Sequence, residues 1–139
     1  MKVTVPVHIV SVANQREHWA KRARRTKGQR GLTRLVLQSK SPKPPAPPLT
    51  VKLTRVAPRS LDCDNNVSAL KAVRDGVADY LGVDDGDDRI TWEYAQAKAS
   101  APRTYLLTIE ISGADRDQKE RRKTVASQEN AKRASDNHQ

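Results

Sequence analysis

The absence of phenylalanine constrains this chain more than any other feature of its sequence. Of its 139 residues, 36% are hydrophobic, and the core has to be built from Val, Leu and Ile with two Trp and three Tyr. A chain of this length corresponds to one compact domain. We therefore expect a small core, whose secondary-structure elements follow from the periodicity of its aliphatic residues.

Several segments have the alternating, β-branched pattern that is typical of strands. They cover residues 2–10, 49–56, 90–97 and 105–112. Pro6 in the first segment lacks a backbone N–H and therefore indicates an edge strand. The proline-rich stretch 41–48 is expected to be an extended loop, and a turn around 100–102 joins the last two strands.

Two helices are predicted between these strands. The clearer one covers 65–81, where apolar residues recur every three or four positions. Asp64 or Asn65 can cap its start, and Gly82 ends it. The other helix extends from 15 to about 38, and its glycines are able to break it into two pieces. Its apolar stripe would consist of Trp19, Ala20, Ala23, Leu32, Leu35 and Val36.

The resulting order, β-α-β-α-β-β, predicts a two-layer α+β domain with a small mixed sheet and two main helices. Residues 1–113 would form this domain. Residues 114–139 are charged, rich in Gln, Asn and Ala, and contain no large apolar residue except Val125. A segment of that composition is expected to be a disordered tail or a solvated helix.

Positive charge is concentrated at the start of the chain. The net charge is +10, and residues 1–48 hold eleven Lys or Arg against Glu17 alone. This excess favours a polyanionic partner, because Lys and Arg neutralise the phosphates of nucleic acids. The candidates for DNA contact are Arg16, Lys21, Arg22, Arg24, Arg25, Lys27, Arg30, Arg34 and, further on, Arg59. The alternative for any one of these residues is that it lies on a solvated helix face and contacts no phosphate. Trp19 is able to stack on a base, but the small core favours a buried position for it.

Half of the sixteen acidic residues lie within 62–88. Asp62 and Asp64 stand two positions apart near the expected start of the second helix, and 84–88 is Asp-Asp-Gly-Asp-Asp. Carboxylate oxygens are preferred ligands of Mg²⁺ and Mn²⁺, which activate water in phosphodiester cleavage. Lys71 is expected on the same helix face as Asp64, where its charge can stabilise the reacting phosphate or orient water. Helix capping and a solvated turn are the alternative roles of these acids.

Other classes of site and location are disfavoured. The EF-hand pattern fails, because Val67 and Val73 occupy its Gly and Glu positions. Cys63 is the single cysteine, which excludes an intrachain disulfide and a Cys-based zinc site and fits a reducing cytoplasm. No segment approaches the ~18 apolar residues of a membrane span, and the start of the chain lacks a secretory pattern, so we expect no membrane partner.

Three segments in order resemble the RusA family of Holliday junction resolvases. They are Leu-Asp-Cys-Asp-Asn at 61–65, Ala-Leu-Lys-Ala-Val-Arg-Asp-Gly-Val at 69–77, and Gly-Val-Asp-Asp-Gly-Asp-Asp-Arg-Ile at 82–90. They are similar to the family's D-x-D-N element, its helix with Lys and Asp four residues apart, and its acidic loop before an apolar strand. Ser-Val-Ala-Asn at 11–14 resembles the family's short Ser/Asn element. The resemblance covers about 3–111.

This resemblance implies a homodimeric, Mg²⁺- or Mn²⁺-dependent endodeoxyribonuclease of the bacterial cytoplasm, commonly encoded by a prophage. Such enzymes resolve four-way DNA junctions by paired symmetric nicks in recombination and repair. By resemblance, Asp62 and Asp64 are catalytic metal ligands and Lys71 is the functional lysine, although its gap from Asp64 is longer here. The third carboxylate is Asp85 or Asp87, with Asp85 favoured as catalytic. A non-catalytic basic DNA-binding protein and a nuclease for other branched DNA are the alternatives.

Overall fold

The computed structural model describes residues 1–10 and 18–113. Within these ranges the elements are β1 (Lys2–Val5), α1 (Trp19–Lys40), β2 (Leu49–Ala57), α2 (Cys63–Ala69), α3 (Lys71–Leu81), β3 (Ile90–Lys98) and β4 (Leu106–Gly113). The predicted α+β class with a mixed sheet is confirmed. The predictions for 11–14, for Arg16 and for the tail from 114 lie outside the described residues.

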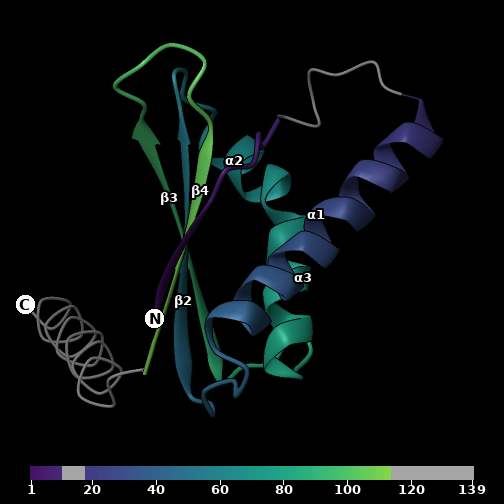
Figure 1. Ribbon diagram of the computed structural model, residues 1–139, viewed down its shortest axis with the longest axis vertical. Helices are drawn as coiled ribbons and strands as arrows, with labels where there is room; N and C mark the ends of the chain where they lie inside the picture. The colour runs from purple at the N-terminus through teal and green to yellow at the C-terminus, as the bar shows by residue number, and fades with distance from the viewer. Residues whose placement is uncertain (11–17, 114–139) are drawn as a thin grey trace, which may run out of the picture.

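The strands form one mixed sheet in the order β1-β4-β2-β3. β2 and β3 are parallel, whereas β4 runs antiparallel to β1 on one side and to β2 on the other. The helices α2 and α3 supply the crossover that a parallel pair of strands needs. β1 is an edge strand, as Pro6 predicted, and it ends at Val5, before that proline. Figure 1 shows α1, α2 and α3 on one side of the sheet.

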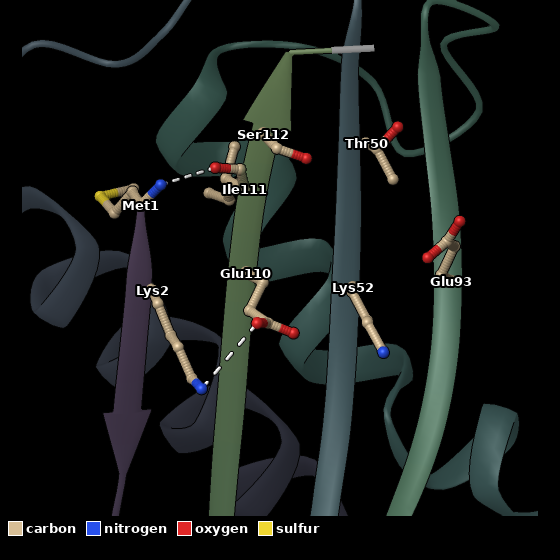
Figure 2. Close-up of a pocket in the computed structure, with 8 residues that line it drawn as sticks. All are labelled: Met1, Lys2, Thr50, Lys52, Glu93, Glu110, Ile111 and Ser112. Carbon is tan, nitrogen blue, oxygen red and sulfur yellow. Dashed lines mark hydrogen bonds and ion pairs between the residues drawn. The ribbon is translucent and has the colours of Figure 1, made fainter. Parts of the chain in front are cut away.

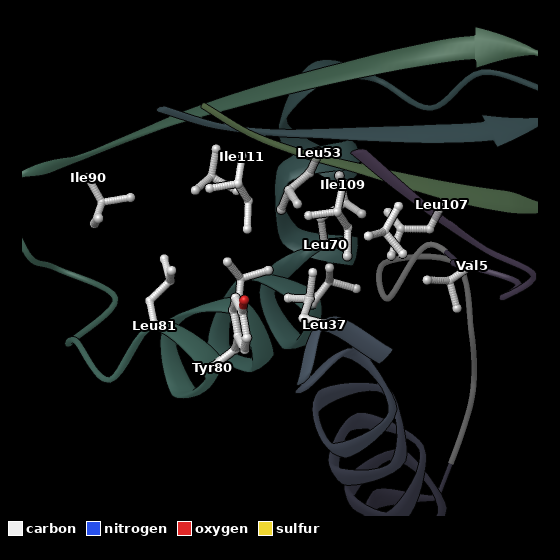
Figure 3. Packing of buried hydrophobic residues seen from close by; sticks show 14 of the residues in the cluster. Val5, Leu37, Leu53, Leu70, Tyr80, Leu81, Ile90, Leu107, Ile109 and Ile111 are labelled. Carbon is white, nitrogen blue, oxygen red and sulfur yellow. The ribbon is translucent and has the colours of Figure 1, made fainter. Parts of the chain in front are cut away.

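The core lies between this helix layer and the sheet. Alternation along the strands directs every second side chain toward the helices, so that Leu53 on β2 and Leu107 and Ile109 on β4 are fully buried. Leu37 of α1 and Leu70, between α2 and α3, approach them from the helix side (Figure 3). The apolar side chains are almost all aliphatic, as the absence of phenylalanine requires.

The opposite face of the sheet is polar. Strand register places Lys2, Glu110, Lys52 and Glu93 in one row across the four strands. Charges of opposite sign therefore alternate along the row, and the Lys2 ammonium lies 4.0 Å from the Glu110 carboxylate (Figure 2). Because these charges balance, this face has no excess of positive charge with which to attract a polyanion.

Helix α1 differs from its prediction in two respects. It is continuous over 22 residues, so Gly28 and Gly31 do not break it. The predicted apolar stripe is wrong for Trp19 and Leu35, which are 75% and 64% exposed, whereas Val36 does pack against the core. Its buried residues are instead Thr33 and Leu37, in the second half of the helix. Figure 1 shows the reason: only this half packs against α3 and the sheet, while the first half extends past them.

The second predicted helix is divided into two. Leu70 separates α2 from α3 with φ −90° and ψ 1°, and its side chain is fully buried. The N-cap is Asp62 instead of Asp64 or Asn65, so the helical segment starts earlier than predicted. Gly82 ends α3 as predicted, with the positive φ of 70° that glycine adopts at low cost.

Candidate nucleic-acid interface and acidic site

Helix α1 presents a dense array of cations. It contains eight Lys or Arg and no acidic residue, and no described helix is long and apolar enough to cross a membrane. Besides Arg30, the exposed members predicted for DNA contact are Lys21, Arg22, Arg24, Lys27 and Arg34. Because the first half of α1 extends past the rest of the fold, these groups are accessible to a large ligand (Figure 1). Phosphate neutralisation is the chemistry that such a surface supports.

Two of the predicted DNA contacts already interact with other residues of this chain. Arg25 is partly buried and interacts within the chain. Arg30 donates two hydrogen bonds to the Asp79 carboxylate of α3, at 2.6 and 2.8 Å. These bonds hold the pKa of the Asp79 carboxyl below its usual value and raise the pKa of Arg30. A phosphate would therefore have to compete with Asp79 for Arg30, whose observed role is to join α1 to α3.

An acidic pocket of about 320 Å³ lies where α1, α3 and the following loop meet. It brings together several residues that are far apart in the sequence: Arg30, Lys71, Asp75, Ala78, Asp79, Val83, Asp84 and Asp85. Lys71 and Asp85, both predicted as catalytic, line this one pocket. Its charged groups include two cations, so the pocket is mixed in charge and could hold water or a polar group.

Asp62 and Asp64 occupy a different position, at the start of α2. Both are exposed, and neither lines the acidic pocket. Asp62 is the N-cap, yet its carboxylate makes no capping hydrogen bond. The prediction that Lys71 shares a helix face with Asp64 assumed one continuous helix. That assumption is wrong, because the break at Leu70 puts Asp64 on α2 and Lys71 on α3.

The segment that leads to Asp62 is held by polar side chains of two paired strands. Arg55 on β2 stands opposite Gln96 on β3 in the parallel register. Arg55 Nη1 donates to the carbonyl oxygen of Arg59 at 2.8 Å, and Gln96 both accepts from and donates to the backbone of Leu61, at 2.8 and 2.7 Å. These bonds fix the backbone immediately before Asp62 and leave its carboxylate exposed.

The acidic loop after α3 is held by Arg74. This guanidinium donates from Nη1 to Tyr94 Oη at 3.0 Å and from Nη2 to the backbone carbonyl oxygen of Asp85. It also lies 4.8 Å above the ring of Trp92 on β3, within cation–π range. Arg74 therefore fixes the backbone at Asp85 against the sheet.

The two candidates for the third carboxylate, Asp85 and Asp87, have different surroundings. Asp87 accepts bonds from Arg89 Nη2 at 2.7 Å and Nε at 3.0 Å, which lower the pKa of Asp87 to about 2. Asp85 lines the pocket with Lys71, and its carboxylate accepts no hydrogen bond in the described part of the chain. A ligand would meet an unpaired carboxylate at Asp85 and an ion pair at Asp87.

The implied divalent cation does not fit the present arrangement of acids. Among residues 1–10 and 18–113, no three His, Cys, Asp or Glu side chains form a group that could hold a metal ion. The four predicted ligands are divided between the start of α2 and the acidic loop, and Asp87 is ion-paired.

Three residues that position the candidate site were not predicted from the sequence: Arg55, Gln96 and Arg74. A signal for the first two was present, because each occupies a position on its strand where alternation directs the side chain inward. Arg55 is only 6% exposed, and burial lowers its pKa. A polar residue at such a position implies partners in the interior.

Comparison of the chain with protein-family models and with curated proteins found no match.

Proposed function

We propose that this protein binds DNA through the exposed cations of α1 and cleaves it as a structure-selective endonuclease, with four-way junctions as its substrate. The observation that carries the proposal is the acid-free helix α1, whose cations extend past the fold. The RusA resemblance supplies the reaction, the junction substrate and a requirement for Mg²⁺ or Mn²⁺. The exposed, free thiol of Cys63 is consistent with a reducing cytoplasm as its location.

The catalytic part of the proposal is supported by how the acids are held. Asp62 is exposed without a capping bond, although Arg55 and Gln96 fix the backbone before it. Exposed carboxylates on a fixed backbone are available to a ligand, whereas acids that serve as caps are already hydrogen-bonded. Lys71 and Asp85 supply a second pair of charged groups in the acidic pocket.

Paired nicks require two sites, so a homodimer with two-fold symmetry is part of this proposal. A symmetric pair would present one α1 to each half of a junction, which is itself nearly symmetric. Light scattering at the concentrations used for cleavage measures the molecular mass directly. A mass of 15.5 kDa under all conditions, that of a monomer, would contradict this part.

Cleavage of a synthetic four-way junction tests the proposed activity, beside duplex and Y-shaped controls, in Mg²⁺, in Mn²⁺ and in EDTA. Wild-type protein is expected to nick the junction only with a divalent cation present. Asp62→Asn and Asp64→Asn should each abolish nicking and keep junction binding, because removal of negative charge does not weaken the attraction to phosphates. Asp88→Asn is the control, since Asp88 is an exposed acid of the loop between α3 and β3 that does not line the pocket. Nicking at the wild-type rate by both α2 variants would exclude these residues from the site.

A second candidate is a basic DNA-binding protein without catalytic activity. One observation favours it: the described acids do not form a group of three or more that could hold a metal. The same experiment separates the candidates, because such a protein would bind the junction and leave it intact with every metal.

A further inference from the structure

Trp19 is the most exposed large hydrophobic side chain in the described part of the chain. This residue is 75% exposed at the first position of α1, in a protein that has no phenylalanine for its core. The other tryptophan, Trp92, is partly buried beneath Arg74. A lone exposed apolar residue is ordinary, so the significance of Trp19 depends on its surroundings.

Those surroundings are cationic and aromatic. Arg22 lies one helical turn after Trp19 and is exposed, and residues separated by three positions are neighbours on a helix surface. The ring of His18 lies 5.6 Å from the indole, centroid to centroid, and tilted by 33°. No acidic residue occurs anywhere in α1. A flat π surface beside phosphate-binding cations is the combination with which proteins hold single-stranded nucleic acid.

We propose that Trp19 is a stacking platform for a base that is unpaired or unstacked, such as one at the branch point of a DNA junction. The inference rests on the proposed binding of DNA through α1 and adds to it the feature that is recognised. Every base has a π face, so stacking on indole works for any sequence. In an intact duplex these faces are covered by neighbouring base pairs, and Trp19 has nothing to stack on. The cations of α1 then supply general affinity, and Trp19 supplies preference for DNA that exposes a base.

Affinity measurements on the full chain test this inference. Fluorescence anisotropy of labelled oligo-dT, a blunt duplex of equal length and a four-way junction gives three dissociation constants for each variant. Trp19→Ala should weaken binding of oligo-dT and of the junction by about 5- to 150-fold, the range found when one stacking aromatic is removed. Duplex binding should stay unchanged, and Trp19→Phe should retain most of the preference because it keeps an aromatic face. Leu35→Ala is the matched control, since Leu35 is the next most exposed large hydrophobic residue of α1, and it should change none of the three constants.

Intrinsic fluorescence gives a second measurement. In a Trp92→Phe variant all tryptophan emission comes from Trp19, and stacking should quench it on titration with oligo-dT and not with duplex. If that variant does not fold, the difference between the wild type and Trp19→Phe gives the same signal.

The outcomes separate this inference from the function on which it rests. If the wild-type protein binds no DNA, both fail. If it binds DNA but Trp19→Ala matches the wild type on all three substrates, α1 binds phosphates and the stacking proposal alone is wrong. An equal weakening on duplex and oligo-dT would also overturn it, because stacking on an exposed base predicts a selective effect. Loss of self-association with unchanged DNA binding would assign Trp19 to a protein interface instead.

Discussion

Gly76 sets how closely α1 and α3 approach, and we expect its replacement by alanine to destabilise the protein. A Cβ atom at this position would lie 2.6 Å from the carbonyl oxygen of Arg30 and 2.8 Å from the Cβ of Thr33. Both separations are shorter than van der Waals contact allows. The carbonyl oxygen is backbone, so no change of side-chain rotamer relieves the clash, and the two helices would have to move apart.

The magnitude follows from two opposing effects. Overpacking a close contact costs roughly 1–3 kcal/mol, and two separations below 3 Å put Gly76→Ala in the upper half of that range. Alanine is favoured over glycine inside a helix by about 1 kcal/mol, which offsets part of the cost. We therefore expect a net decrease of roughly 1–2 kcal/mol in the free energy of unfolding. At about 4 °C per kcal/mol, Tm should fall by about 4–8 °C.

Urea unfolding and thermal melts followed by far-UV circular dichroism measure this change. Gly28→Ala and Gly31→Ala are matched controls on α1, because a Cβ at either position meets nothing within 4 Å. The free energy of unfolding of these two variants should rise by roughly 0.5–1 kcal/mol, because alanine has the higher helix propensity. If Gly76→Ala were as stable as its controls, the close approach of α1 to α3 would be refuted, and with it the geometry that joins Arg30 to Asp79.

Three other predictions concern the acidic loop and the basic helix. Arg74→Ala should release the backbone at Asp85 and lower the free energy of unfolding by roughly 1–3 kcal/mol. Amide hydrogen exchange in the loop should become faster, and unchanged exchange would show that Arg74 does not hold the loop. Asp87 has a pKa of about 2, below the ordinary value of 3.8. Its pair with Arg89 therefore stabilises the folded state fully at pH values above 3.8, and this stabilisation is lost as the pH falls through 2. The urea midpoints of wild type and Asp87→Asn should therefore converge over that interval, whereas a constant gap would count against the pair. Neutralising Arg22 together with Arg24 should flatten the plot of log K against log salt by about 0.9 for each phosphate that the protein no longer neutralises, and an identical slope would make them solvated residues.

The strands were predictable because their signal is local. Alternation with period two identifies β2, β3 and β4 to within a residue or two at either end. Pro6 indicated the edge position of β1 for an equally local reason, its missing N–H. The helix end at Gly82 was predictable for the same reason, because the positive φ there depends on glycine alone. Features of this kind depend on covalent structure and hardly on what packs nearby.

Burial on α1 was not predictable in the same way. Whether an apolar side chain is covered depends on a partner surface, and α3 covers only the second half of this helix. Thr33 became buried, while Leu35 stayed exposed, because the close approach at Gly76 lies beside Thr33. The glycines of α1 cost helix propensity of about 1 kcal/mol each, and continuous backbone hydrogen bonding through position 40 outweighs that cost.

The candidate site divides where the predicted helix divides. On one side of Leu70, the paired side chains of β2 and β3 fix the backbone that leads to Asp62. On the other side, Arg74 fixes the loop that carries Asp85. Leu70 is fully buried between them, so the orientation of α2 relative to α3 is determined by how the core packs around this leucine. The spacing of acids along the sequence identifies which residues are candidates, but the separation between the two groups is a property of the core. In the described part of the chain these acids do not form a group of three that could hold one metal ion, so a metal shared by both groups would require α2 or the acidic loop to move.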